Sequence, residues 1–350
     1  MHEARVLVVD DSAAMRALFS DILDEAKNVR VVVTRKMPAA VEAEIASRYD
    51  ALFNKTDVAL APDQLKQVLQ QADIVMTTVT DRWSEEIFNT PGIRARMLCN
   101  VGVGVNHINV AAAKRAGITI SNTPDVVTED TADIAIALML MSMRRLGEGE
   151  RHVRNGAWGG LRPTFMLGRT LRRKTLGIVG YGRIGRAVAR QAAAAFDMKI
   201  IYHAPRDPRI DDPATAGPAG AERMESLDAL LQRADVVSLH CPATPETRHL
   251  MNARTLALMP EHAYLVNTAR GDVVDEAALT SVLKERKIAG AGLDVYEFEP
   301  SVTAELKELE NVVLLPHLGS ATIETRTNMG MRALSNLDSF VANGTVTDLV

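Results

Sequence analysis

The chain has few cysteines and few aromatic residues, and it lacks a large excess of charge. Among its 350 residues are 2 cysteines, and 4% of the residues are aromatic. The formal net charge is −4. Cys99 and Cys241 have no histidine or cysteine neighbours at ligand spacing, which argues against a disulfide framework or a zinc site and fits a reducing compartment. The near balance of acids and bases gives no electrostatic footprint for nucleic acid or an anionic membrane.

Long hydrophobic runs are also missing. The longest strongly apolar stretch, Ile134 to Met143, is too short to span a bilayer. The N-terminus shows no basic segment followed by an apolar core and a small-residue cleavage site, so we expect a cytoplasmic protein. With 47% hydrophobic residues, the chain can bury sizeable cores, and its length favours two domains.

What the sequence does have is a glycine fingerprint at mid-chain, between a short apolar strand and a helix with small and apolar positions. The fingerprint comprises Gly180, Tyr181, Gly182, Arg183, Ile184 and Gly185. Gly180 permits the tight turn, Gly182 lets the backbone approach a pyrophosphate, and Gly185 lets the helix pack on the strand. The motif therefore predicts a dinucleotide site with the phosphates at the positive end of the helix.

From the fingerprint onward, apolar runs alternate with helical patterns, which predicts a parallel sheet with helices on both faces. Strands are expected near 176–180, 198–203, 235–240, 263–266, 290–295 and 312–315, and helices near 183–195, 226–233, 247–258 and 275–286. The proline-rich stretch from Pro205 to Gly220 is expected to be a surface loop.

The first half shows a looser alternation, which predicts a second, smaller α/β unit. Its expected strands are 29–34, 74–78, 97–101 and 118–121, and its expected helices are 39–47, 63–71 and 110–116. Glu129 to Leu146 is predicted as a long helix that is apolar almost all round. Such a helix must be covered either by the rest of the chain or by a second subunit, and both alternatives stay open.

Residues 1–27 resemble the opening strand and helix of a response-regulator receiver domain, with an acidic pair at Asp10 and Asp11. A receiver also needs a phosphorylatable aspartate at the end of a buried strand. The nearest candidate, Asp57, follows no apolar strand. We therefore interpret residues 1–27 as an extension without receiver function.

Three polar residues follow predicted strands, namely Arg270, Glu299 and His317. Ligands of open α/β sheets bind beyond the carboxyl ends of the strands. A cationic histidine can protonate a carbonyl oxygen as hydride reaches the carbon, and a neighbouring carboxylate favours the imidazolium. Arginine offers a planar fork of donors for a carboxylate. Each residue taken alone could have a purely structural role, but the three together predict hydride transfer to a 2-keto acid.

These motifs resemble the D-isomer-specific 2-hydroxyacid dehydrogenases, most closely the glyoxylate/hydroxypyruvate reductase branch. The resemblance runs from about Val29 to Gly344 and includes further motifs at 101–109, 122–133 and 240–249. It implies a Rossmann-type nucleotide domain over 123–317 and a smaller, discontinuous, flavodoxin-like substrate domain over 28–122 and 318–350. It also implies an active site between the domains and a homodimer built on the nucleotide domains.

The resemblance also implies roles for single residues. Arg270 would bind substrate, Glu299 would pair with the catalytic His317, and Asp294 would contact the nicotinamide carboxamide. Backbone amides around Val101, Gly102 and Val103 would hold the substrate carboxylate. Further cofactor contacts are expected at Cys241, Pro242, Thr247, Thr268 and Ala269. At Asn109 the family usually carries aspartate, and either residue can cap the following helix.

The residues after the second strand of the nucleotide domain favour NADP over NAD. A preference for NAD needs an acid about 20 residues after the glycines, whereas a nearby arginine suits a 2′-phosphate. Ala204 occupies the place of the acid, and Arg206 follows it. Asp207 is the counterargument, because a different loop path would bring it to the ribose.

The predicted activity is the reduction of glyoxylate or hydroxypyruvate with NADPH. The alternatives are oxidation of formate, phosphite or a bulkier hydroxy acid, since substrate pockets depend on loops such as those of Trp83 and Trp158. A dinucleotide-sensing protein without catalysis is a third class. The intact set of Arg270, Glu299 and His317 argues against it.

Overall fold

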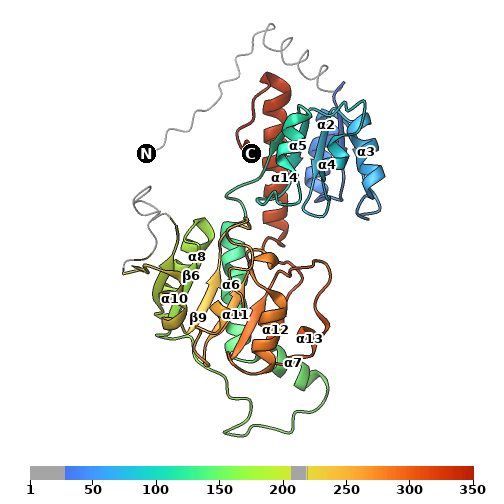
Figure 1. Ribbon diagram of the computed structural model, residues 1–350. Coiled ribbons are helices and arrows are strands. Elements are labelled where there is room, and N and C mark those ends of the chain that lie inside the picture. The colour runs from blue at the N-terminus through green and yellow to red at the C-terminus, as the bar shows by residue number, and fades with distance from the viewer. Residues whose placement is uncertain (1–27, 206–217, 219) are drawn as a thin grey trace, which may run out of the picture. The chain divides into compact units, whose positions relative to one another are not determined.

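The computed structural model describes residues 28–205, 218 and 220–350, which divide into two compact units (Figure 1). The first unit holds the described residues up to Val126 together with Ile323–Val350, and the second is Val127–Thr322. The domain boundaries expected from the sequence, 122/123 and 317/318, lie a few residues before the two points at which the chain passes from one unit to the other. The receiver-like opening, Arg206 and Asp207 lie outside the described residues.

A five-stranded parallel sheet forms the centre of the first unit. Its strands are β1 (Arg30–Val33), β2 (Asp50–Phe53), β3 (Ile74–Thr77), β4 (Met97–Asn100) and β5 (Thr119–Ser121), in the order β2-β1-β3-β4-β5. This order is that of flavodoxin-like folds, as predicted. Every residue of β3 and β4 is buried, whereas the edge strand β2 alternates between exposed and half-buried positions. β2 was not predicted, because its apolar run of Ala51, Leu52 and Phe53 is short.

The helices of the first unit include the end of the chain. They are α2 (Ala39–Arg48), α3 (Pro62–Gln71), α4 (Glu85–Phe88), α5 (Val110–Arg115) and α14 (Ile323–Asn343). α14 packs on α2 and β4 (Figure 1). The approach is so close that a Cβ at Gly330 would lie 2.6 Å from a methyl carbon of Val41. α5 is capped by Asn109, whose Oδ1 accepts from the Ala112 N–H at 3.0 Å, so asparagine serves as a cap here.

The second unit contains a seven-stranded parallel sheet. Its strands are β6 (Thr175–Val179), β7 (Lys199–His203), β8 (Glu222–Arg223), β9 (Val236–Leu239), β10 (Tyr264–Asn267), β11 (Gly290–Leu293) and β12 (Val312–Leu314). Their order is β12-β11-β10-β9-β6-β7-β8. Counted from β6, this is the Rossmann order 3-2-1-4-5-6 with one further strand at the edge. The predicted Rossmann-type fold is confirmed.

The helices of the second unit cover both faces of this sheet (Figure 1). They are α6 (Thr128–Met143), α7 (Leu146–Arg154), α8 (Arg183–Phe196), α10 (Leu227–Arg233), α11 (Ala253–Leu256), α12 (Glu276–Lys284) and α13 (Ala304–Glu308), with a 3-10 turn η2 (Gly271–Val273). A helix over 247–258 was expected, but the chain forms a turn before α11 because Thr247 binds back to nearby backbone atoms.

The long apolar helix predicted over 129–146 is α6, and one side of it is buried by its own unit. It packs on α8, β10 and β11, and Gly292 of β11 lies so close that a Cβ there would be 2.9 Å from the Leu138 Cβ. The helix ends at Met143, earlier than predicted, because Arg145 adopts a left-handed conformation with φ 56°. Apolar positions such as Ile134, Ile136 and Leu140 are only half-buried, so cover of these positions by a second subunit stays a prediction.

In the described part of the chain, no helix is long and apolar enough to cross a membrane. No group of histidine, cysteine, aspartate and glutamate side chains there is arranged to hold a metal ion.

Candidate functional site

The glycine fingerprint forms the turn between β6 and α8, and its three glycines have different surroundings. A Cβ at Gly180, where φ is 91°, would lie 2.5 Å from the Cys241 backbone nitrogen. A Cβ at Gly185 would lie 2.4 Å from the Gly180 carbonyl oxygen. Gly182 has no atom within 4 Å of such a Cβ. Packing thus requires the first and third glycines, while the second leaves the open space that a pyrophosphate needs.

Tyr181 lies within the fingerprint, but its side chain is turned into the core. It is 1% exposed, and its ring stacks on that of Tyr202 with centroids 3.8 Å apart. A role of Tyr181 in cofactor binding is therefore restricted to its backbone. Its neighbours differ, since Arg183 is exposed and Ile184 is half-buried at the start of α8.

The other predicted cofactor residues lie after the next strands at the same edge of the sheet. Cys241 follows β9 with 8% of its surface exposed. The Thr247 hydroxyl donates to the Pro242 carbonyl at 2.6 Å and so shapes the 242–247 turn. After β10, the Thr268 hydroxyl oxygen is buried and has no partner in the described structure. The Ala269 N–H donates to the Asn267 side chain.

Glu299 and His317 form a hydrogen-bonded pair in the loops that follow β11 and β12. Glu299 Oε2 lies 3.0 Å from His317 Nδ1, and each side chain is about one-third exposed. The other carboxylate oxygen of Glu299 accepts from the Tyr296 N–H at 3.0 Å. Burial alone would raise the pKa of Glu299, but the hydrogen bond and charge of His317 outweigh it and hold this pKa below its usual range.

Arg270 lies in the loop after β10, beside the loop of Glu299. The Asn267 amide donates to the Arg270 carbonyl at 2.9 Å and fixes the turn. Gly271 lies against Tyr296, so close that a Cβ would be 1.8 Å from the Tyr296 carbonyl carbon. Burial lowers the pKa of Arg270, and the Glu299 and Asp272 carboxylates oppose that shift. The guanidinium is thus a partly desolvated cation close to the carboxylate of the pair.

Asp294 follows β11 and holds the loop of His317. It is 1% exposed. Its two oxygens accept from the Leu318 N–H at 2.7 Å and the Gly319 N–H at 2.8 Å, and its carbonyl accepts from the His317 N–H at 2.9 Å. Burial raises the pKa of Asp294, although the two amides oppose this shift. Its carboxylate therefore shapes the histidine loop here, and a contact with the nicotinamide carboxamide remains a prediction.

In the first unit, the segment Val101–Val103 follows β4, and its amides differ from expectation. The Val101 N–H donates to the Thr77 carbonyl at 2.8 Å, and the Gly102 N–H donates to the Asn100 carbonyl at 3.0 Å. The Val101 amide is therefore committed to the sheet and is not free for a substrate carboxylate. Within the described residues, the Val103 N–H makes no such backbone bond.

Asn100 determines how this segment is turned. Its Nδ2 donates to the Gly102 carbonyl at 3.0 Å and to the Gly104 carbonyl at 3.1 Å, and its Oδ1 lies 3.1 Å from His107 Nε2. Carbonyl and N–H of a trans peptide point in opposite directions. Because the Gly102 carbonyl faces the buried Asn100, the N–H of Val103 faces away from it and is available to an anion.

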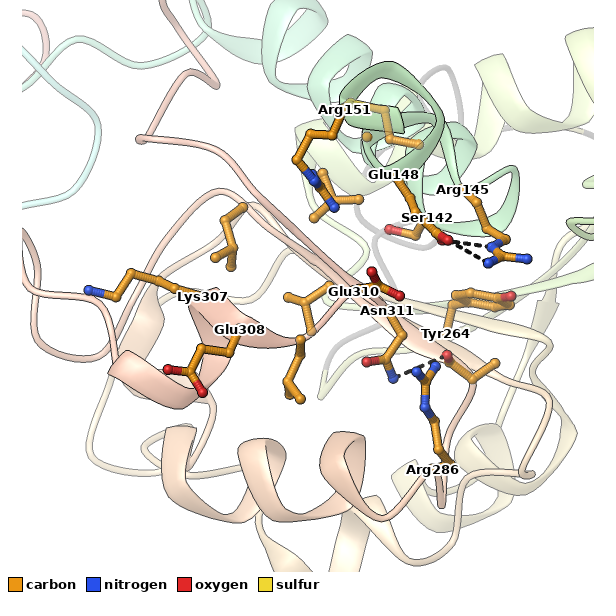
Figure 2. A pocket seen from close by; sticks show the side chains of 17 residues that line it. Ser142, Arg145, Glu148, Arg151, Tyr264, Arg286, Lys307, Glu308, Glu310 and Asn311 are labelled. Carbon is orange, nitrogen blue, oxygen red and sulfur yellow. Dashed lines mark hydrogen bonds and ion pairs between the residues drawn. The ribbon is translucent and has the colours of Figure 1, made fainter. Parts of the chain in front are cut away.

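A cavity of about 590 Å³ lies elsewhere on the second unit (Figure 2). Figure 2 shows Arg151, Glu148, Glu310 and Tyr264 around it. Its lining includes residues at the beginnings of strands, such as Tyr264 and Val312. Because ligands of open α/β sheets bind at the carboxyl ends of strands, this cavity at the amino edge is not the catalytic site.

Sequence reasoning missed the positioning residues Asn100 and Asn267 and the loop-holding role of Asp294. Both asparagines are the last residues of buried strands, which is a signal for function at a carboxyl edge. A buried amide at that place needs partners, and the nearest unpaired groups are the backbone atoms of the loop that follows.

Comparison with known proteins identifies the family. The model of the D-isomer specific 2-hydroxyacid dehydrogenase NAD-binding domain matches residues 136–319. The chain is 40% identical over 326 residues to a glyoxylate reductase of Thermococcus litoralis, covering 92% of this chain and 96% of the relative.

Two solved structures are similar over both units. One is described as a D-isomer specific 2-hydroxyacid dehydrogenase from Polaromonas, with TM-score 0.85, 34% identity and coverage of 92% of this chain and 99% of that one. The other is an NADPH-dependent glyoxylate/hydroxypyruvate reductase from Sinorhizobium meliloti in complex with NADP and malonate, with TM-score 0.79, 31% identity and coverage of 92% and 96%. The chain therefore belongs to the D-isomer specific 2-hydroxyacid dehydrogenases and is a nicotinamide-dinucleotide-dependent oxidoreductase.

Proposed function

We propose that the protein reduces glyoxylate or hydroxypyruvate to the corresponding 2-hydroxy acid. The observation that carries this proposal is the Glu299–His317 pair, 3.0 Å apart, with Arg270 in the adjoining loop. A histidine held by a carboxylate can protonate a carbonyl oxygen, and a desolvated guanidinium can bind a carboxylate, so the site suits a substrate that bears both groups. The similar proteins from Thermococcus and Sinorhizobium are named for these substrates.

In this proposal, His317 is the proton donor. Its Nδ1 is held by Glu299, and within the described part of the chain its Nε2 makes no hydrogen bond, so Nε2 is the nitrogen that protonates the keto oxygen. Arg270 binds and polarises the substrate. The Val103 N–H holds the carboxylate. The bound dinucleotide supplies the hydride.

We further propose that NADPH is preferred to NADH. Ala204 stands at the end of β7, where a carboxylate would accept from the ribose 2′-hydroxyl of NAD, and it is 7% exposed. A phosphate at that position meets no repelling charge from this residue.

The test is a panel of 2-keto acids assayed with both cofactors. We expect the highest kcat/KM for glyoxylate and hydroxypyruvate, and a higher kcat/KM with NADPH. A higher kcat/KM for bulkier keto acids, or oxidation of formate or phosphite in their place, contradicts the substrate proposal. A preference for NADH contradicts the cofactor proposal and leaves the substrate proposal standing.

We also propose a homodimer that covers α7 and the segment after it. Exposed large hydrophobic side chains gather there, namely Leu146, Val153, Trp158, Leu161 and Leu167. None of the residues of α7 is buried, and exposed apolar groups in one segment are typical of an interface. Sedimentation of the wild type should give twice the chain mass, and L161E should shift it toward the monomer. A wild type that sediments as a monomer contradicts this proposal.

Finally, we propose that the enzyme works in the cytoplasm. Both cysteines are free and buried, and burial raises the pKa of the Cys99 thiol to about 12 and that of Cys241 to about 11. These thiols are unreactive, in keeping with a compartment where no disulfide is formed. Fractionation of expressing cells should recover the activity with cytoplasmic markers, and recovery in a secreted or membrane fraction contradicts the proposal.

A further inference from the structure

Arg223 ends the edge strand β8 and reaches the end of the neighbouring strand β7. Its Nη2 donates to the Ala204 carbonyl at 3.2 Å. Ala204 is the residue directly after β7, where dinucleotide enzymes of this fold contact the adenosine ribose. The guanidinium therefore lies at the ribose end of the expected dinucleotide site, although Arg223 is 38 residues after the last glycine of the fingerprint, Gly185.

The side chain of Arg223 is on the same face of the sheet as α8. In the parallel pair of β7 and β8, Arg223 is in register with Tyr202. Tyr202 belongs to the buried cluster that contains Ala187 and Val188 of α8, and registered residues of neighbouring strands share a face. The N-terminus of α8 is the proposed pyrophosphate site, so Arg223 and the phosphate-binding turn are on one face.

The glycine turn and Arg223 flank the end of β7 from its two sides. The Gly180 N–H donates to the His203 carbonyl at 2.9 Å, and Arg223 binds the next carbonyl along the chain. Neighbouring strands lie about 4.8 Å apart, so β8 is roughly 10 Å from β6. Arg223 is thus separated from the pyrophosphate turn by the width of one strand, which leaves room for a ribose between them.

The charge of Arg223 is not neutralised by a neighbouring acid within the described structure. Glu222, the adjacent residue, has its side chain on the opposite face and pairs with Arg233 of α10 at 2.7 Å. Both residues of β8 are exposed. A guanidinium that is anchored through one N–H retains further donors for a ligand.

From these observations we propose that Arg223 binds the 2′-phosphate of a phosphorylated dinucleotide and so determines cofactor specificity. The proposal rests on the proposed preference for NADPH and names a residue that produces it. The dianionic phosphate accepts charge-assisted hydrogen bonds from the guanidinium, while the 2′-hydroxyl of NAD gains little from it. The contact with Ala204 holds the guanidinium in place before the cofactor binds, which reduces the entropy lost on binding.

The test compares Arg223→Gln with wild type by titration calorimetry of the full chain. The probes are 2′,5′-ADP, which carries the 2′-phosphate, and 5′-AMP, which does not. Loss of a charged hydrogen-bonding group predicts weaker binding of 2′,5′-ADP by about tenfold or more, with binding of 5′-AMP unchanged. The affinity of Arg223→Lys for 2′,5′-ADP should lie between those of wild type and Arg223→Gln, because lysine keeps the charge but lacks the planar fork.

Arg172→Gln is the matched control. Arg172 is also an exposed arginine that donates to a backbone carbonyl, that of Ala195 at 3.4 Å, but it precedes β6 at the amino edge of the same sheet. It should bind both probes as the wild type does. Unchanged binding of 2′,5′-ADP by Arg223→Gln, or equal weakening of both probes, overturns the proposal.

The same preparations separate this proposal from the proposed function. If wild type prefers NADH in turnover but Arg223→Gln still loses 2′,5′-ADP affinity, the role of Arg223 stands and the NADPH preference fails. If wild type prefers NADPH and the variant binds 2′,5′-ADP normally, the preference stands and Arg223 is not its cause.

Discussion

Glu299 and His317 are joined by a hydrogen bond of 3.0 Å between Oε2 and Nδ1, and each is held by a separate backbone contact. The Tyr296 N–H fixes the carboxylate, and the Asp294 carbonyl accepts from the His317 N–H. The pair is thus positioned before any substrate binds, which removes part of the cost of orienting an acid catalyst.

His317→Ala should lower kcat for glyoxylate by about 10²- to 10⁴-fold, because a positioned general acid contributes on that scale. Dinucleotide affinity should stay at the wild-type value, as calorimetry can show. His262→Ala is the control, since His262 is an exposed histidine paired with Asp235 away from the carboxyl edge. A wild-type kcat for His317→Ala would contradict the catalytic role of His317.

Glu299→Gln should change the pH dependence of reduction. The pKa of Glu299 is held below its usual range, so the carboxylate is present throughout the neutral range and is lost only as pH falls through that lowered value. Glutamine has no charge to lose in that range, so the fall in kcat/KM that accompanies protonation of Glu299 in the wild type at acid pH should be absent from the variant.

A profile of Glu299→Gln that is merely scaled down, with both limbs in place, would contradict an electrostatic role. Stability gives a second readout with a defined sign. The lowered pKa of Glu299 contributes stability above the unfolded-state value that is lost in acid. The wild type should therefore lose stability more steeply than the variant as pH falls below about 4.5, the unperturbed value near which glutamate titrates.

Gly182→Ala should impair dinucleotide binding, whereas Gly185→Ala should impair stability. A Cβ at Gly182 meets no atom within 4 Å, so this variant should unfold at the wild-type Tm but bind dinucleotide more weakly. A Cβ at Gly185 would lie 2.4 Å from the Gly180 carbonyl oxygen, and overpacking of this kind costs roughly 1–3 kcal/mol. Thermal unfolding and calorimetry distinguish the two variants. A lowered Tm for Gly182→Ala would contradict the open space beside Gly182.

Asn100→Ala should raise the KM for glyoxylate about tenfold, because two net hydrogen bonds to the 102–104 carbonyls disappear and the Val103 amide is no longer held outward. The kcat should fall less than kcat/KM. Asn109→Asp, which keeps the cap of α5, serves as the control with wild-type kinetics. If Asn100→Ala lowers kcat with KM unchanged, the segment does not hold substrate.

Much of the fold follows from local sequence patterns. The apolar runs at β3, β4, β6 and β10 predict buried strands because hydrophobic continuity is a property of consecutive residues. The edge strand β2 is not predicted in this way, because its apolar run of Ala51, Leu52 and Phe53 is short. Likewise, the apolar helix α6 is recognisable from its residues, but its cover depends on β10, β11 and α8, which are far away in the chain.

The local sequence is enough to predict the glycine turn and the polar residues at the strand ends, including Arg270, Glu299 and His317, because turn geometry and side-chain chemistry are local. Which atoms these groups contact depends on the tertiary structure. Asn100 holds the loop carbonyls, and Arg223 reaches Ala204. The reason is that strand order and register bring together residues far apart in the chain, and a buried polar group binds whatever they place beside it.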